Sequence, residues 1–519
     1  MKTVHSGHAY VAFERHLEAA ARRISGEVRG VGVHRPETVS ERVVQRIVEL
    51  TLWPFVALFA RDPEGVQGGD RAVICDGITL NPNSGRVTIS FTRLLGGVGE
   101  FLAHWAHMTY AVIGGGFSGR PAGGPSATLL FGVGLESIVH DGSDARFLHF
   151  CRVGPIESLR SARSLIVQAN QANLVSSDPE WAGYDRFPLH HYLRTRSVGF
   201  AARLALLTTQ LRALVSFAQG ILASPLIALL ARDVAYSFVV TEMDKRGMID
   251  AVLVTNASYA SQPLWMRSPG QRAFPVYMVW YSQNVQPMVY RSDGLQSVLP
   301  NYRHLWADEH WVWTPGLKTY LEHLSIPGPI HVVGPILWYL PEAVATPGDG
   351  IRIVIFDITP VTDERAGQIG LICNYYSASH MIRFIEETVA ACRAVEADTG
   401  MHIRLYLKHK RGYNPGHDSR YIELIRHLTE PGGEIRLLPS ETNMFTLLRN
   451  AALAVVVPYS SPAYVADAVG TPAVFFDPTE ELLPQFEQTP KVGFASGCVA
   501  LRERIEKAVC QHGAGHQPR

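Results

Sequence analysis

One stretch, residues 454–478, constrains the fold more than any other part of the chain. An apolar run at 454–457 leads into a hydroxyl-rich loop, then into a segment that opens at Pro462 and closes at Gly470, and then into a second apolar run. Proline in the first turn and glycine just past the last turn are the usual boundaries of a helix. A crossover this short between two apolar strands predicts a parallel β-α-β unit.

The loop of this unit places three polar residues before the predicted helix: Tyr459, Ser460 and Ser461. A helix N-terminus offers backbone N–H groups and partial positive charge, and adjacent serines add hydroxyl donors at the same point. We therefore predict that this loop binds a phosphate of the substrate. The alternative is that Ser460 only caps the helix.

Composition narrows the class of protein. A chain of 519 residues predicts two to four domains. The 47 Lys and Arg balance the 47 Asp and Glu, which argues against a nucleic-acid-binding protein that relies on bulk positive charge. The six cysteines are scattered, without a zinc spacing, and the N-terminus does not resemble a secretory signal. We expect a cytoplasmic protein.

The order of predicted elements divides the chain into three parts. Residues 1–125 are predicted to form accessory helices and a β-hairpin around NPNSG. Strands alternate with helices over 126–340, with a helical insertion at about 195–240. A segment rich in Pro, Gly and small residues then precedes a second β-α-β series over 341–519. This order predicts two α/β domains of the Rossmann-like kind.

The insertion contains an uncharged run, residues 213–230, that only just reaches the length of a membrane span. Three arginines flank it: Arg203, Arg212 and Arg232. This pattern favours an interfacial or buried helix pair over a span, and it leaves peripheral membrane contact as an expectation.

Parallel sheets bind ligands beyond the carboxyl ends of their strands. The loop after the first strand of the second part carries Glu136, Asp141 and Asp144, and we predict that one of them is a catalytic general base. Acidic residues in a Gly-rich loop can also be solvated turn formers. Asn284 follows another strand and is predicted to bind a sugar or a base.

Cationic residues end a strand of the third part: Lys408, His409, Lys410 and Arg411. They belong to the same predicted sheet as Ser460 and Ser461. Cations and hydroxyls that meet at one sheet edge can hold a pyrophosphate or a nucleoside phosphate through charge-assisted hydrogen bonds. We therefore predict that these four residues also bind the substrate, although basic runs are often only solvated surface.

This organisation resembles the GT-B glycosyltransferase architecture, in which two Rossmann-like domains face each other across a cleft. PYSSPAYVADAVGTPAVFFDP is similar to the P-F-T-S segment of the bacterial polysaccharide biosynthesis PFTS-motif family, and TNASYASQPLWMRSPGQRAFPVYMVWYSQN resembles that family's N-terminal half. The resemblance covers about 128–500 and leaves the N-terminal α+β accessory segment uncovered. It implies a glycosyltransferase that needs no cofactor, with a nucleotide sugar as donor and a surface glycan or lipid-linked precursor as acceptor.

The loop also resembles the Ser-Ser element of bacterial sialyltransferases and Kdo transferases, which use CMP-activated sugars. This resemblance implies that the hydroxyls of Ser460 and Ser461 contact the nucleotide phosphate. Those families pair the element with His-Pro after a lysine, whereas His409 is followed here by Lys410. No D-x-D element is visible, so we predict no metal and expect protein dipoles and cations to stabilise the leaving phosphate.

Three other functions fit parts of the sequence. A polyol-phosphate transferase of the teichoic-acid type has a similar Y-S-S-x(4)-D arrangement, with the more distant Asp467 as the match here. A sugar-nucleotide epimerase shares the two-domain fold. A non-catalytic scaffold of a polysaccharide assembly complex would need only the apolar stretch at 213–230.

Overall fold

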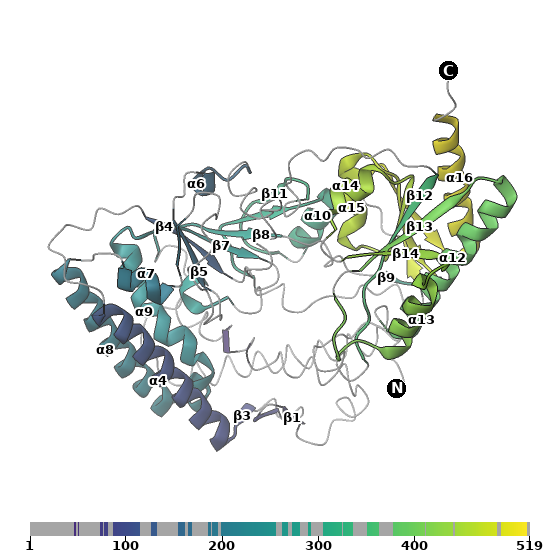
Figure 1. Cartoon of the computed structure of the whole chain (residues 1–519). Helices are drawn as coiled ribbons and strands as arrows, with labels where there is room; N and C mark the ends of the chain where they lie inside the picture. Colours follow the sequence, from purple (N-terminus) through teal and green to yellow (C-terminus); the bar gives the residue numbers. More distant parts are fainter. Residues whose placement is uncertain are drawn as a thin grey trace.

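The computed structural model shows two α/β domains and a layer of long helices packed on the first of them (Figure 1). It describes residues 46–47, 50, 73–75, 77–80, 87–114, 126–131, 154–160, 164–168, 185–187, 189–195, 199–255, 262–267, 272–280, 289–291, 305–323, 325–335, 350–362, 377–409, 412–439, 442–484 and 489–515.

The N-terminal domain is built on a parallel sheet whose described strands lie in the order β6-β5-β4-β7-β8-β10-β11. Numbered along the chain, this order is 3-2-1-4-5-6-7, the doubly wound arrangement of a Rossmann-like domain. The central strands read as continuous apolar runs because both faces are covered. The strands are β4 (Ala127–Phe131), β5 (Ser164–Gln168), β6 (Asp185–Phe187), β7 (Ile249–Thr255), β8 (Val276–Val279), β10 (Glu309–Val312) and β11 (Ile330–Val332).

The C-terminal domain repeats the arrangement with the order β14-β13-β12-β15-β16-β18, which is 3-2-1-4-5-6 along the chain. Every pair is parallel, and Ile355 of the central strand lies between Leu407 and Val455. The two Rossmann-like sheets confirm the predicted fold class. The strands are β12 (Ile351–Phe356), β13 (Ile403–Lys408), β14 (Ile435–Leu438), β15 (Leu453–Val456), β16 (Ala473–Asp477) and β18 (Val492–Ser496).

The predicted β-α-β unit is β15-α15-β16. The helix begins at Ser461, one residue before Pro462, and ends at Gly470, whose φ of 86° is the left-handed conformation that glycine adopts without strain. The helices of this domain are α12 (Ala378–Thr399), α13 (Ser419–Thr429), α14 (Met444–Arg449), α15 (Ser461–Val469) and α16 (Gly497–Gly515).

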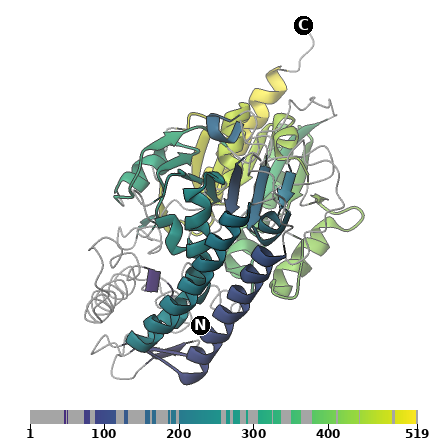
Figure 2. The same cartoon turned by 90° about the vertical axis from the view of Figure 1, so that its left-hand side faces the viewer.

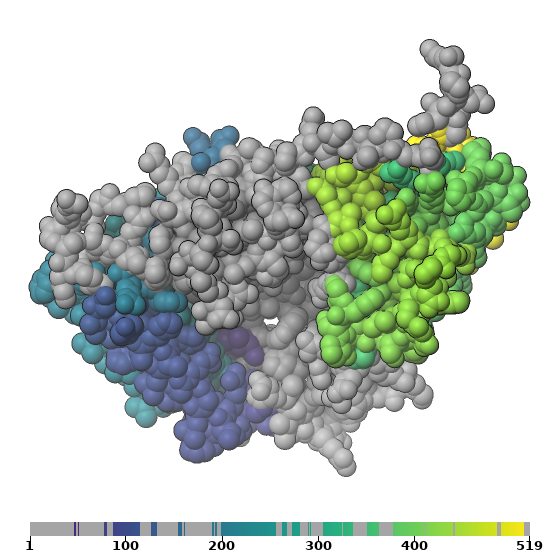
Figure 3. Space-filling view, viewed as in Figure 1, coloured from purple at the N-terminus to yellow at the C-terminus, as the bar shows by residue number. Residues whose placement is uncertain are grey.

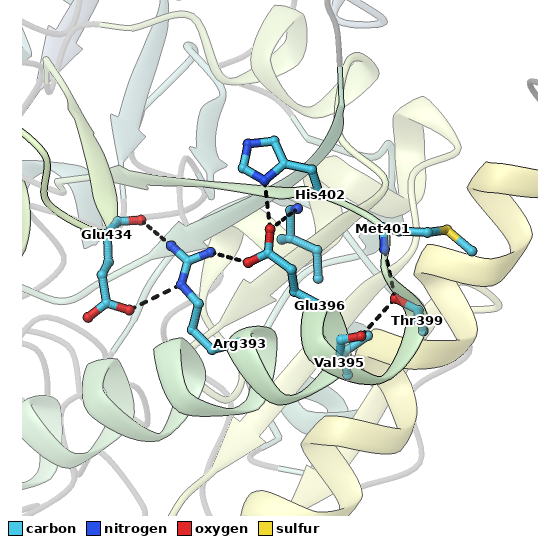
Figure 4. Close-up of polar contacts among 8 residues, drawn as sticks. Arg393, Val395, Glu396, Thr399, Met401, His402 and Glu434 are labelled. Atoms are coloured by element: carbon cyan, nitrogen blue, oxygen red, sulfur yellow. Dashed lines mark hydrogen bonds and ion pairs between the residues drawn. The ribbon is translucent and has the colours of Figure 1, made fainter.

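A polar network fixes the amino-terminal edge of the C-terminal sheet (Figure 4). Arg393 bridges Glu396 on α12 and Glu434 just before β14, with N–O distances of 2.6 and 3.1 Å. Glu396 also accepts hydrogen bonds from the Nδ1 of His402 and the backbone N–H of Ile403. Partial burial raises the pKa of Glu396, but the hydrogen bonds from His402 and Arg393 outweigh it and lower that pKa. These contacts tie α12 to the starts of β13 and β14.

Long helices cover the N-terminal domain on one side (Figures 1 and 2). Phe101 and Phe217 stack with ring centroids 3.9 Å apart, and the buried guanidinium of Arg203 donates to the carbonyl of Val112 at 2.7 Å. These contacts join the neighbouring helices α4 and α8 into one packed layer. The layer contains α4 (Phe91–Ile113), α7 (Leu189–Thr195), α8 (Phe200–Ala223), the 3-10 helix η2 (Pro225–Leu230) and α9 (Ala231–Lys245).

The hairpin predicted around NPNSG is confirmed, because β2 (Ile78–Leu80) pairs antiparallel with β3 (Val87–Ile89). A further strand, β1 (Val73–Cys75), pairs with β2 across a turn at Gly77, whose φ is 71°. The alternation of strands and helices over 126–340 predicts a helix between β7 and β8, but the described residues there form only the 3-10 turn η4 (Leu264–Arg267). Pro269 follows two residues after η4, where a proline disfavours continuation of a helix.

Glycine lets α4 pack closely on η2. A Cβ added at Gly97 would lie 2.5 Å from the carbonyl oxygen of Ala228, whereas one added at Gly99 would meet nothing within 4 Å. We expect Gly97→Ala to lower the free energy of unfolding by about 1–3 kcal/mol through overpacking. Gly99→Ala should raise it by about 0.5–1 kcal/mol, because alanine favours the helix. Urea unfolding of both variants measures the difference, and equal effects would contradict this packing.

The two domains meet at the carboxyl edges of their sheets. The chain leaving β8 forms β9 (Val289–Tyr290), the chain leaving β16 forms β17 (Leu482–Leu483), and these two strands pair antiparallel. The backbone N–H of Arg291 also donates to the carbonyl of Glu481 at 2.8 Å. Two further helices of the N-terminal domain among the described residues are α6 (Glu157–Arg160) and α10 (Pro315–His323). In the space-filling view the helical layer and the C-terminal domain lie at opposite sides of the molecule (Figure 3).

Candidate functional site

The strand order locates the candidate site in the C-terminal domain. The order reverses between β12 and β15, and open α/β sheets bind ligands outside the carboxyl ends of the strands at such a switch point. Asp357 follows β12, and the loop with Ser460 and Ser461 follows β15. The residues predicted from the β-α-β unit therefore lie at the switch point of their sheet.

Tyr459 shapes the turn before α15. Its backbone has a φ of 59°, which is uncommon for a residue other than glycine, and its side chain is buried. The ring lies 5.2 Å from that of Phe475, and the hydroxyl donates to the carbonyl of Leu483 at 3.3 Å. The structure thus places this predicted ligand-binding side chain in the core beneath the turn.

The hydroxyl of Ser460 donates to the carbonyl of Val457 at 2.7 Å and makes no side-chain cap with the amides of α15. Simple helix capping, the alternative considered for Ser460, is therefore not its role in this structure. Ser461 is the first residue of α15 and is partly exposed. Of the two serines, Ser461 is the better placed to meet a ligand at the helix N-terminus.

A buried carboxylate lies beside this turn. Asp357 accepts hydrogen bonds from the hydroxyl of Tyr421 at 2.6 Å, the hydroxyl of Thr359 at 3.2 Å and the Nδ1 of His409 at 3.3 Å. Its side chain is fully buried, so these donors replace the water that would otherwise solvate the charge. The cluster links the carboxyl ends of β12 and β13.

The imidazole of His409 connects this carboxylate to the surface. Because a carboxylate only accepts hydrogen bonds, Nδ1 carries the proton that faces Asp357, and Nε2 forms a hydrogen bond with the hydroxyl of Tyr413 at 2.7 Å. Burial and the charge of Asp357 raise the pKa of Tyr413 and of Tyr421, so both phenols stay protonated donors. His409 is buried, and the exposed Tyr413 is the member of this chain that faces solvent.

Lys408 is the last residue of β13, and it is buried. Its ammonium group donates to the carbonyl of His409 at 3.4 Å. Strands β13 and β15 flank β12, so their ends lie roughly 10 Å apart, at about 4.8 Å per strand spacing. This separation suits a phosphate group bound between the cation and the serine loop.

Several predicted site residues lie outside the described part of the chain. They are Glu136, Asp141, Asp144, Asn284, Lys410 and Arg411. The first three follow β4, which neighbours β7 where the strand order of the N-terminal sheet reverses. Within the described residues no group of three or more His, Cys, Asp or Glu side chains is arranged to hold a metal ion. These assignments and metal independence stay predictions.

Sequence reasoning missed three residues of the site: Asp357, Tyr413 and Tyr421. An aspartate directly after the apolar run IRIVIF was a usable signal, because it marks the carboxyl end of a strand. It also missed Asp477, the buried last residue of β16, which accepts from the backbone N–H groups of Thr479 and Leu482 at 3.0 and 2.8 Å. Those bonds shape the loop that reaches the other domain through β17.

Two Rossmann-like domains joined at their carboxyl edges, with a polar switch-point site in the second, define the GT-B class of fold. A family model agrees with this class: the polysaccharide biosynthesis PFTS motif family matches residues 213–505, more than half of the chain. The chain belongs to this family. The matched range includes the serine loop with Ser460 and Ser461.

Solved structures of similar architecture are distant in sequence. A protein assigned as a UDP-N-acetylglucosamine 2-epimerase from Listeria monocytogenes has a TM-score of 0.38 and 12% identity, covering 75% of this chain and 89% of that one. Phytolacca americana UGT2, complexed with UDP-2fluoro-glucose and pterostilbene, has a TM-score of 0.34 and 10% identity, with coverages of 74% and 90%. The glycotransferase of kitacinnamycin has a TM-score of 0.34 and 14% identity, covering 76% of this chain and 96% of that one. No curated protein matches the chain.

Proposed function

We propose that the protein transfers a sugar from a nucleotide-activated donor, preferably a CMP-sugar, to a bacterial surface polysaccharide or a lipid-linked glycan precursor. The observation that carries this proposal is the pairing of the serine loop with Lys408 and the Asp357 cluster at the switch point of the C-terminal sheet. Membership of a polysaccharide biosynthesis family supports the acceptor class. The CMP preference rests on the Ser-Ser resemblance.

In this proposal the C-terminal domain binds the nucleotide. The N-terminus of α15 and the hydroxyl of Ser461 meet the phosphate, and Lys408 neutralises the charge that develops as the sugar leaves. Lys410 and Arg411 add charge-assisted bonds in the same loop. Tyr459 and Ser460 hold the turn, through the bonds to Leu483 and Val457, and so position Ser461.

The acceptor side belongs to the N-terminal domain. One carboxylate among Glu136, Asp141 and Asp144 removes the proton of the acceptor hydroxyl, and Asn284 binds the sugar or the base. No metal ion or other cofactor takes part. The reaction takes place in the cytoplasm, at the inner face of the membrane, where lipid-linked precursors are accessible. Contact between the two domains excludes water, which would hydrolyse the donor.

The products test this proposal. We expect the purified protein, incubated with CMP-, UDP- or GDP-sugars and a membrane glycan extract, to release free nucleotide and to form no new phosphodiester in ³¹P NMR spectra. A phosphodiester product would indicate a polyol-phosphate transferase. A changed nucleotide sugar without acceptor would indicate an epimerase, and no turnover of any donor would favour a scaffold.

A further inference from the structure

The helical layer of the N-terminal domain exposes an unusual amount of apolar surface. Ten of the 14 large apolar side chains that are exposed among the described residues lie on α4 and α8. At roughly 100 Å² each they amount to on the order of 1,000 Å², whereas soluble monomers rarely expose apolar patches above a few hundred Å². An exposed apolar surface of this size indicates an interaction site.

The apolar side chains on α8 form one stripe. Successive members are four or seven residues apart. Because a helix turns by about 100° per residue, these intervals place all of them within roughly 60° around the helix axis. Leu222 is 88% exposed, and Leu211 is 60% exposed. The stripe consists of Phe200, Leu204, Leu211, Val215 and Leu222.

Helix α4, which lies beside α8 (Figure 2), carries a second stripe. Phe101 and Met108 of α4 face the buried side of the layer, so the exposed side chains lie on the outer side of the helix. Together with the stripe of α8 they form what we call the α4–α8 surface. The stripe on α4 consists of Phe91, Leu95, Leu102, Tyr110 and Ile113.

Helix α8 is the described helix that is long and apolar enough to cross a membrane, by length and composition alone. It is neither a core helix nor a free span. Only 28% of its most apolar stretch is buried, while Phe217 and Arg203 fix its inner face to α4. A helix that is fixed on its inner face and apolar on its outer face can lie parallel to a membrane, with the outer face at the boundary between headgroups and acyl chains.

The charges around the surface match an anionic lipid. The two helices contain a single carboxylate, Glu100, which the helical spacing places on the side of α4 away from its stripe. The exposed Arg212 lies beside the stripe of α8, and the guanidinium of Arg194 lies 5.8 Å from the ring of Tyr110. The same two helices of a second copy would offer these arginines no carboxylate apart from Glu100, whereas anionic headgroups attract them.

We propose that the α4–α8 surface binds the protein to the headgroup region of an anionic membrane. This inference deepens the proposed function, because it rests on the expectation of a membrane-associated acceptor. The surface belongs to the N-terminal domain, while the candidate nucleotide site belongs to the C-terminal one. Lipid binding would thus hold the acceptor domain at the membrane without occupying the nucleotide site.

Vesicle sedimentation tests this proposal. We expect the protein to sediment with vesicles of phosphatidylglycerol and phosphatidylcholine more strongly than with phosphatidylcholine alone. Leu211→Ser combined with Leu222→Ser should weaken binding by about tenfold or more, because apolar contact is lost from the stripe. Arg212→Glu should remove the preference for the anionic lipid. The matched control is Val499→Ser on α16, a side chain that is 76% exposed and should leave binding unchanged.

Several outcomes would overturn the inference. The protein could stay in the supernatant with both vesicles, or the double leucine variant could bind as the unmodified chain does. Light scattering could instead show a dimer that the same variant dissociates, which would assign the surface to a second copy. Nucleotide binding is measured in parallel on these variants, so that failure of the lipid inference is distinguished from failure of the proposed transferase.

Discussion

Replacing Asp357 with alanine is expected to lower the free energy of unfolding by about 3–5 kcal/mol. The carboxylate is fully buried and accepts from Tyr421, Thr359 and His409. Without it, the buried donors lose their acceptor, and each such loss costs about 1–3 kcal/mol. Urea unfolding followed by tryptophan fluorescence measures the change. Tyr421→Phe, which removes one of the three donors, should cost about 1–2 kcal/mol.

The control for this prediction is Asp398→Ala. Asp398 forms an ion pair with Arg502, but both side chains are about half exposed, so its loss should cost less than about 1 kcal/mol. If Asp357→Ala were no more destabilising than Asp398→Ala, the buried cluster would not hold the ends of β12 and β13 together, and the geometry of the candidate site would lose its support.

The second large effect concerns Tyr459. Tyr459→Ala should lower the free energy of unfolding by about 3–5 kcal/mol, because it removes a buried aromatic ring that packs on Phe475. Tyr459→Phe should cost about 1 kcal/mol or less, since it loses only the 3.3 Å bond to the carbonyl of Leu483.

Thermal unfolding and nucleotide titration of both Tyr459 variants check this prediction. The phenylalanine variant should retain nucleotide binding. If it kept its stability and lost the nucleotide, the phenol would be a direct ligand contact, as the sequence alone led us to predict. If both variants were equally unstable, the hydroxyl rather than the ring would hold the turn.

The sequence predicted the fold well where local signals agree with tertiary structure. The unit at 454–478 has apolar strands, Pro462 in the first helical turn and a glycine stop at Gly470, and each signal points to the same structure. Accessory helices were predicted within 1–125, but α4 was not located, because Gly96, Gly97 and Gly99 lower its helix propensity. Close packing of Gly97 against Ala228 is a tertiary contact that propensity cannot report.

The site was predicted only in part for a similar reason. Lys408 ends one strand and Ser461 follows another, and both strands could be recognised locally, so both residues were found. The bond between Asp357 and Tyr421 joins residues 64 positions apart, and it forms only because β12 lies between β13 and β15. That strand order could not be predicted from the sequence alone. The burial of the Tyr459 side chain likewise depends on a tertiary contact, its packing on Phe475.

A thermal-shift titration with CMP, CDP, UDP, GDP and ADP tests the central claim most directly, because a ligand that binds only the folded state stabilises it by about 2.7 kcal/mol at 100 times its Kd. We predict selective stabilisation by one nucleotide, with a strong loss in Ser461→Ala and in Lys408→Ala. Ser419→Ala is the control, since Ser419 opens α13 as Ser461 opens α15 and should leave the shift unchanged. No shift with any nucleotide, or a shift that both site variants retain, would contradict a nucleotide site at this edge of the sheet.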